Sequence, residues 1–240
     1  MGTTRSLLGP IGLTLFLLAV DAAISMGLVS SMVSFLHHNG RGPFAVASPD
    51  ASPFLLAGEP VNFVGNHGHT TNAAAGTALI VVGLGGSIAL WLERRERNKW
   101  DRSSSFFRIW TVLVLLSLLL TMAALIYTLV ETAKTGGQAI DIGVARMYPH
   151  PSKYPNGRWT PENWYAAVLD LPLASANQRR VINGNLTIMR AWRWNLVALF
   201  ILGFILLALV VLEVLGMRKR GLQPVAMVDI LTTPVKRVDI

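Results

Sequence analysis

The stretch NLVALFILGFILLALVVLEVLG, residues 195–216, decides the class of this protein. Its one charged residue is Glu213, and it is long enough to cross a bilayer, which takes about 20 apolar residues. Three more stretches of this kind occur at 7–36, 73–92 and 107–130. We therefore predict an all-α membrane protein with four transmembrane helices.

The composition supports this class and excludes others. Of the 240 residues, 52% are hydrophobic and 14% are charged, against about 25% charged residues in an average soluble domain. The formal net charge of +8 comes from Lys and Arg beside the apolar spans, so we attribute it to membrane orientation and expect no nucleic-acid partner. The absence of cysteine excludes disulfides, thiolate metal sites, iron–sulfur clusters and a cysteine nucleophile.

The distribution of positive charge predicts the orientation. The connection 93–106 carries several Arg and Lys residues, whereas the loop 37–72 carries only Arg41. By the positive-inside rule both termini are expected to be cytosolic. The membrane itself is expected to be the plasma membrane or an endomembrane. The expected divisions are a cytosolic N-terminus (1–6), a first span (7–36), outer loop one (37–72), a second span (73–92), a cytosolic loop (93–106), a third span (107–130), outer loop two with helices (131–194), a fourth span (195–216) and a cytosolic tail (217–240).

The second outer loop is expected to be partly helical. Thr160 followed by Pro161 is a helix-start signal, and the apolar residues that follow have helical spacing, so this helix should lie on the membrane or cap the bundle. Ser175 and Gln178 have capping-box spacing, and the helix that they open should run directly into the fourth span. The first outer loop, rich in Pro, Ala, Ser and Gly, is expected to be irregular.

A ladder of small residues follows one face of the first span. Small side chains permit close approach of two helices in a membrane, and the second span offers counterparts, so we predict contact between these two spans. The other interpretation is that Gly and Ala are simply common in such helices. The predicted packing residues are Ala19, Ala23, Gly27, Ser31, Gly83 and Gly86.

Asp21 lies within the first span, where a carboxylate costs roughly 2.5–3.5 kcal/mol to insert. The core of each span lacks Lys, Arg and His, so hydroxyl groups are the expected partners. Asp21 then acts as a structural hydrogen-bonding group, handles a proton or ligand, or contacts a partner subunit. The candidate hydroxyls are those of Thr77, Ser87, Ser117, Thr121 and Thr128.

Four histidines bracket the first outer loop: His37, His38, His67 and His69. Four imidazoles on one side of a membrane could meet around zinc or copper, although neutral histidine is also ordinary at an interface. No other cofactor and no catalytic residue is predicted.

Two short motifs suggest covalent modification. MGTTRS at the N-terminus fits N-myristoylation at Gly2, and Asn185-Leu186-Thr187 is a glycosylation sequon on the expected outer side. The position of Asn185 in a helix close to the membrane argues against its use.

The run WTPENWYAAVLDLPLASANQRR (159–180), followed by MRAWRWN (189–195), resembles multispan membrane proteins of filamentous fungi, over roughly residues 154–216. The four-span plan is also similar to claudin-like fungal families that organise plasma-membrane domains. The structured second loop, the small-residue packing faces and the scarcity of reactive groups favour a non-enzymatic organising or accessory role, with membrane lipids and other membrane proteins or further copies as partners.

The alternative function is a small membrane-embedded enzyme or accessory factor in the biosynthesis of a hydrophobic secondary metabolite, with Asp21 or the histidines near a lipid-accessible pocket. A transporter is disfavoured, because no internal repeat is visible.

Overall fold

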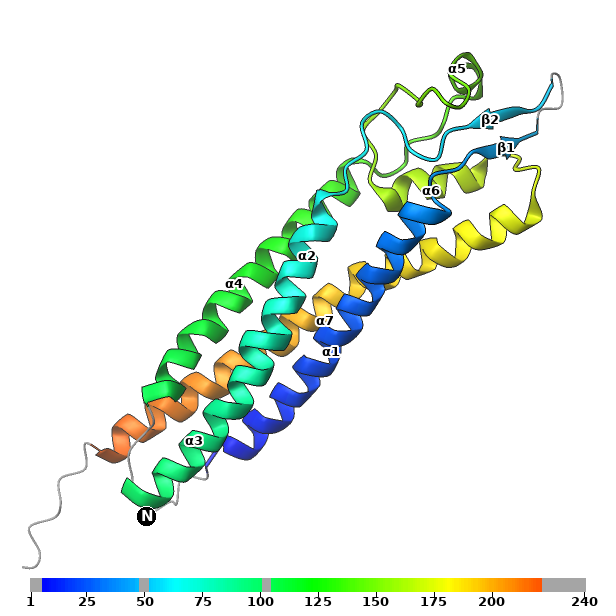
Figure 1. The fold of residues 1–240 in the computed structure, drawn as a ribbon. Coiled ribbons are helices and arrows are strands. Elements are labelled where there is room, and N and C mark those ends of the chain that lie inside the picture. The colour runs from blue at the N-terminus through cyan, green and yellow to red at the C-terminus, as the bar shows by residue number, and fades with distance from the viewer. Residues whose placement is uncertain (1–5, 48–51, 101–104, 222–240) are drawn as a thin grey trace, which may run out of the picture.

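The computed structural model describes residues 6–47, 52–100 and 105–221, except for the side chains of His67, 97–100 and 218–221. Four long helical segments lie side by side in an elongated bundle (Figure 1), which confirms the predicted all-α, four-span fold. The spans are formed by α1 (Leu8–His38), by α2 (Asn66–Thr77), η1 (Ala78–Leu84) and α3 (Gly85–Trp100) together, by α4 (Ser105–Lys134), and by α7 (Ala176–Gly221).

The outside of this bundle is apolar. Large side chains such as Phe16, Ile109 and Phe204 are 58–65% exposed. Apolar exposure over the length of a bundle suits contact with lipid, whereas soluble proteins rarely expose contiguous apolar patches of this kind. All four segments are long and apolar enough to span a bilayer. The protein is therefore a multi-pass membrane protein.

The second span contains a seven-residue π-helix, η1. Beside it, the buried indole of Trp110 on α4 donates a hydrogen bond to the carbonyl oxygen of Val82 at 3.2 Å. A Cβ added at Gly86 would lie within 3 Å of both the Trp110 ring and the Leu15 side chain. The π segment and the missing Cβ therefore let α1, α3 and α4 approach one another closely.

The two long loops, 37–72 and 131–194, fold together into a cap at one end of the bundle (Figure 1). The first loop forms an antiparallel pair, β1 (Phe44–Val46) and β2 (Phe54–Leu56), so the expectation of an irregular loop is wrong over these residues. Second-loop backbone borders both strands: Ala174 N donates to Ala45 O and His150 N donates to Leu55 O, each at 2.8 Å. The strands are held by partners far along the chain, which local composition does not reveal.

The remaining elements of the cap are α5 (Ile142–Met147) and α6 (Pro161–Asp170). The continuous helix α7 has 46 residues, a length of about 69 Å at 1.5 Å per residue, well beyond a hydrocarbon core of about 30 Å. Its predicted continuity with the fourth span is confirmed. At the end opposite the cap, the buried Glu213 on α7 accepts a hydrogen bond from the Leu7 backbone N–H at 2.8 Å. The carboxylate thus satisfies a free donor at the start of α1.

Candidate functional site

Helix α6 fastens the cap to the bundle. It starts where the sequence predicts, because the Thr160 side chain accepts from the Asn163 backbone N–H at 3.4 Å and Pro161 occupies the first turn. Its next turn carries the fully buried Trp164 and Tyr165. The indole N–H of Trp164 donates to the carbonyl oxygen of Gly58 at 2.7 Å. The hydroxyl of Tyr165 donates to the carbonyl oxygen of Gly40 at 2.8 Å. Both bonds join the second long loop to the first.

The two acceptor residues, Gly40 and Gly58, lie where the beginning and the end of the first loop cross in close backbone contact. The Gly58 N–H donates to the carbonyl oxygen of Arg41 at 3.0 Å. A Cβ on Gly58 would overlap the Arg41 carbonyl group and the Gly40 carbonyl oxygen, and a Cβ on Gly40 would overlap the hydroxyl of Tyr165. Glycine is therefore needed at both positions because no side-chain atom fits there.

Aromatic rings fill the inside of the cap. Trp159 and Trp164 meet edge to face with centroids 5.2 Å apart, and Tyr154 lies 5.8 Å from the Trp164 ring. On the α1 side, the rings of Phe35 and Tyr165 are 5.0 Å apart. Buried aromatic pairs add roughly 0.5–1.5 kcal/mol each beyond the area that they bury, so the cap is a packed unit continuous with α1.

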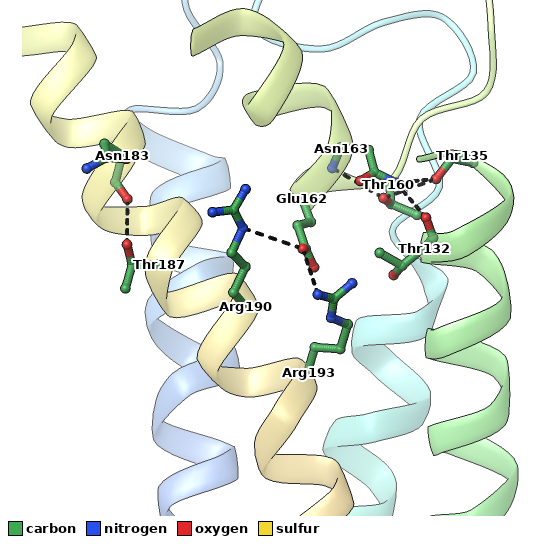
Figure 2. A network of polar contacts seen from close by, with 9 residues as sticks. All are labelled: Thr132, Thr135, Thr160, Glu162, Asn163, Asn183, Thr187, Arg190 and Arg193. Atoms are coloured by element: carbon green, nitrogen blue, oxygen red, sulfur yellow. Dashed lines mark hydrogen bonds and ion pairs between the residues drawn. The ribbon is translucent and has the colours of Figure 1, made fainter. Parts of the chain in front are cut away.

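Figure 2 shows a polar network between α4 and α6. The amide nitrogen of Asn163 donates to the carbonyl oxygen of Thr132 at 2.8 Å and to the hydroxyl of Thr135 at 2.6 Å. Helix α4 ends at Lys134, so its last carbonyls have no partner within the helix. Asn163 supplies one, and the α4 end is therefore fixed to the first turn of α6.

Beside this network, Glu162 lies between two arginines of α7 (Figure 2). Its Oε1 is 3.3 Å from Nη2 of Arg193 and 3.8 Å from Nε of Arg190. The carboxylate is 11% exposed. Burial raises the pKa of Glu162, and the positive charges of Arg193 and Arg190 oppose that rise. The pair links the cap to α7, and sequence reasoning missed it because the charges that contact each other lie about 30 residues apart.

Four large side chains on the outer elements of the cap are exposed. Met147 is 70% exposed, Leu55 46%, Tyr148 43% and Ile142 38%. These four residues, which we call the cap patch, belong to β2, α5 and the residue that follows α5. The two segments adjoin, because the Arg146 guanidinium lies over the Phe54 ring at 5.8 Å. The sequence offers no periodic signal for a patch assembled from both loops.

Asp21 lies in α1 at a polar spot facing α7. The amide nitrogen of Asn195 donates to the Asp21 carbonyl oxygen at 3.3 Å and to the Ser25 hydroxyl at 2.7 Å. Within the part of the chain that the structure describes, the buried Oδ2 of Asp21 has no hydrogen-bond partner. The expected hydroxyl partner is therefore missing for this oxygen.

Three of the candidate hydroxyls bond their own helices instead. The Thr77 hydroxyl donates to Ala73 O, the Ser87 hydroxyl to Gly83 O and the Thr121 hydroxyl to Ser117 O, at 2.8–3.0 Å. Such bonds to the carbonyl four residues earlier are common for Ser and Thr in helices. The sequence signal missed at this spot was Asn195, an amide at the start of the fourth apolar stretch.

The small residues of α1 divide into two groups. A Cβ on Gly83 would lie 3.3 Å from the Cβ of Ala19, so the first two spans touch there, and Gly86 lies against Leu15. Further toward the cap, the helix face turns away from the second span. There Ala23, Gly27 and Ser31 are exposed.

The histidines are engaged separately. Nδ1 of His38 lies 2.8 Å from the Ser34 carbonyl oxygen, and Nδ1 of His37 lies 3.2 Å from the Arg41 guanidinium. His69 is exposed in the first turn of α2, and the His67 side chain lies outside the described residues. Among the residues described, no three His, Cys, Asp or Glu side chains are grouped to hold a metal ion.

The two modification motifs have different outcomes. Asn185 is partly buried on α7, and its amide nitrogen donates to the Val181 carbonyl oxygen at 2.9 Å. The sequon's Thr187 bonds back to Asn183 O at 3.0 Å. Both side chains that a glycosylating enzyme must reach are thus held in helical hydrogen bonds. Gly2 lies outside the described residues.

Fold and site together define a four-span membrane protein with a packed cap made from both of its long loops. No protein family, curated protein or solved structure matches the chain.

Proposed function

We propose that the protein has a non-enzymatic organising or accessory role in its membrane, and that the cap patch contacts the outer segment of another membrane protein. The observation that carries this proposal is the exposure of Leu55, Ile142, Met147 and Tyr148 on a cap whose interior is closely packed. Tyr, Met and Arg are enriched at protein interfaces, and Arg146 adjoins the patch. The cap is then on the outer side and both termini are cytosolic, as the basic connection 93–106 indicates.

The packing of the cap supports a recognition role. A surface held by Trp164, Tyr165 and Glu162 is pre-organised, and pre-organisation lowers the entropic cost of binding. Truncation of a central aromatic residue at an interface typically costs more than 1 kcal/mol of binding free energy.

The test is site-specific photo-crosslinking in the native membrane. A photoreactive residue replaces Met147 in the full chain, and the crosslinked species are identified by mass spectrometry. We expect one defined membrane protein to be captured in amounts comparable with the chain. The double change Leu55→Ser and Tyr148→Ser should abolish the capture, whereas Asn183→Ser, an exposed change on α7, should preserve it. Crosslinks to lipid alone, or capture unaffected by the double change, contradict the proposal, and crosslinks between copies replace the partner with self-association.

A second candidate function is a membrane-embedded enzyme or accessory factor for a hydrophobic secondary metabolite. The observation in its favour is the buried Oδ2 of Asp21, which has no hydrogen-bond partner among the described residues. In this function, Asp21→Asn abolishes formation of the metabolite while expression and the thermal unfolding of the purified protein stay unchanged. Unaltered metabolite levels in that variant would exclude the role of the carboxyl.

A further inference from the structure

The structure also contains a groove far from the cap, on the membrane-facing side of the bundle. It runs between α1 and the second span, and its cavity volume is about 360 Å³, within the range of roughly 300–1,000 Å³ typical of small-molecule sites. We propose that this groove binds one anionic glycerophospholipid, with an acyl chain between the helices and the phosphate on Arg94.

The groove is open because the residues on its floor are small. It is lined by Gly12, Phe16, Ala19, Gly83, Leu84 and Ser87, among others. Toward the cap, the groove passes the close approach of Ala19 and Gly83 and reaches Leu79. The exposed Phe16 and Leu84 border it on the lipid side. An acyl chain lying in the groove would contact apolar atoms of α1 on one side and of the second span on the other. It would take the place of a freely diffusing lipid at this surface.

The π segment helps to form this groove. η1 (Ala78–Leu84) supplies Gly83 and Leu84 to its wall. A π-helix has a wider turn than an α-helix and often occurs at functional sites. The groove therefore coincides with the irregular part of an otherwise regular bundle.

Charge selects the occupant. The groove continues along α3 past Trp91 to Arg94, and α3 lies at the end of the bundle away from the cap (Figure 1). The neighbouring Arg95 lies over the Trp91 ring at 5.6 Å. The exposed Arg94 has no ion pair among the residues described. An exposed guanidinium such as that of Arg94, at the end of an apolar groove, matches a lipid phosphate at the membrane surface.

The chain offers matched pairs of variants for a test. Arg94→Gln and Arg95→Gln remove the same charge from adjacent positions, but only Arg94 lines the groove. Gly12→Leu adds a side chain inside the groove, next to Leu90, whose Cδ1 would be 3.8 Å from the new Cβ. Gly9→Leu adds the same side chain to the same helix in open space.

The experiment is native mass spectrometry of the full chain after reconstitution in vesicles of phosphatidylcholine with phosphatidylserine and extraction in mild detergent. We expect one phosphatidylserine retained per chain. Arg94→Gln should lower its retention relative to phosphatidylcholine about fivefold, the effect of one cation at a membrane surface. Gly12→Leu should lower retention of both lipids.

The controls decide the outcome. Arg95→Gln and Gly9→Leu should retain lipid like the unaltered chain. The proposal is overturned if the unaltered chain retains no stoichiometric lipid, or if the two arginine variants behave alike. The arginine pair also tests the site without Gly12→Leu, should that variant not fold. Since none of these residues belongs to the cap patch, the result is independent of the proposed organising role.

Discussion

Replacement of Gly58 by alanine should open the cap. The new Cβ would overlap backbone atoms of Gly40 and Arg41, which cannot move aside as the end of a flexible side chain can. The first loop must therefore separate at its crossing. That separation breaks the 3.0 Å bond from the Gly58 N–H to Arg41 O and the 2.7 Å bond from the Trp164 indole to Gly58 O.

The magnitude follows from these two bonds. Each contributes about 1 kcal/mol net, and leaving the buried indole N–H unsatisfied costs about 1 kcal/mol more. The sum is about 3 kcal/mol, so the equilibrium between closed and open cap shifts roughly a hundredfold.

Hydrogen–deuterium exchange of the purified full chain in detergent measures that shift. We expect exchange to rise by roughly a hundredfold in peptides covering 40–47 and 161–170, with the transmembrane part of α4 unchanged. Gly184→Ala is the matched control, because its Cβ enters open space on α7 and an alanine favours the helix. Equal protection of the cap in the two variants would refute the idea that close backbone approach at Gly58 holds the loops together.

Three further changes test other contacts of α6. Tyr165→Phe removes the donor to the Gly40 carbonyl and should destabilise the cap by about 1–2 kcal/mol, measured as faster exchange of the same peptides; unchanged exchange would mean that water replaces the hydroxyl. Thr160→Ala removes the helix cap and should cost about 1 kcal/mol in thermal unfolding followed by near-ultraviolet circular dichroism, and Thr160→Ser should restore most of it. Because burial raises the folded-state pKa of Glu162 above its ordinary 4.5, its stabilising contribution is present below pH 4.5 and is lost as the pH rises through the raised value. Glu162→Gln should therefore flatten the decline of melting temperature above pH 4.5, and an unchanged slope would assign the pH dependence to other groups.

The parts of the fold that the sequence predicts are those with local causes. Apolar length alone identifies the four spans. Thr160 and Pro161 mark the start of α6, and the Gln178 N–H donates to the Ser175 hydroxyl at 3.3 Å at the start of α7. Each signal acts within a few residues, so no knowledge of distant partners is needed.

The missed features depend on partners far along the chain. β1 and β2 are three residues each, too short for an alternating pattern to stand out, and they are fixed by second-loop backbone. The ion pairs of Glu162 with Arg190 and Arg193 arise only once α6 lies across α7. The neighbour of Asp21 was missed because Asn195 looked like a span boundary, whereas α7 continues well beyond it toward the cap.

The unbroken length of helix α7 has a mechanical consequence. It contacts α6 near one end and α1 along the membrane, and Glu213 near its other end holds the start of α1. It has no proline and no interruption between Ala176 and Gly221, so it lacks the usual causes of a sharp bend. A continuous helix without a hinge transmits a tilt of one end along its length. A partner that rocks the cap therefore displaces the opposite end of α7 as well, and a push on one surface of the membrane reaches the other through a single helix.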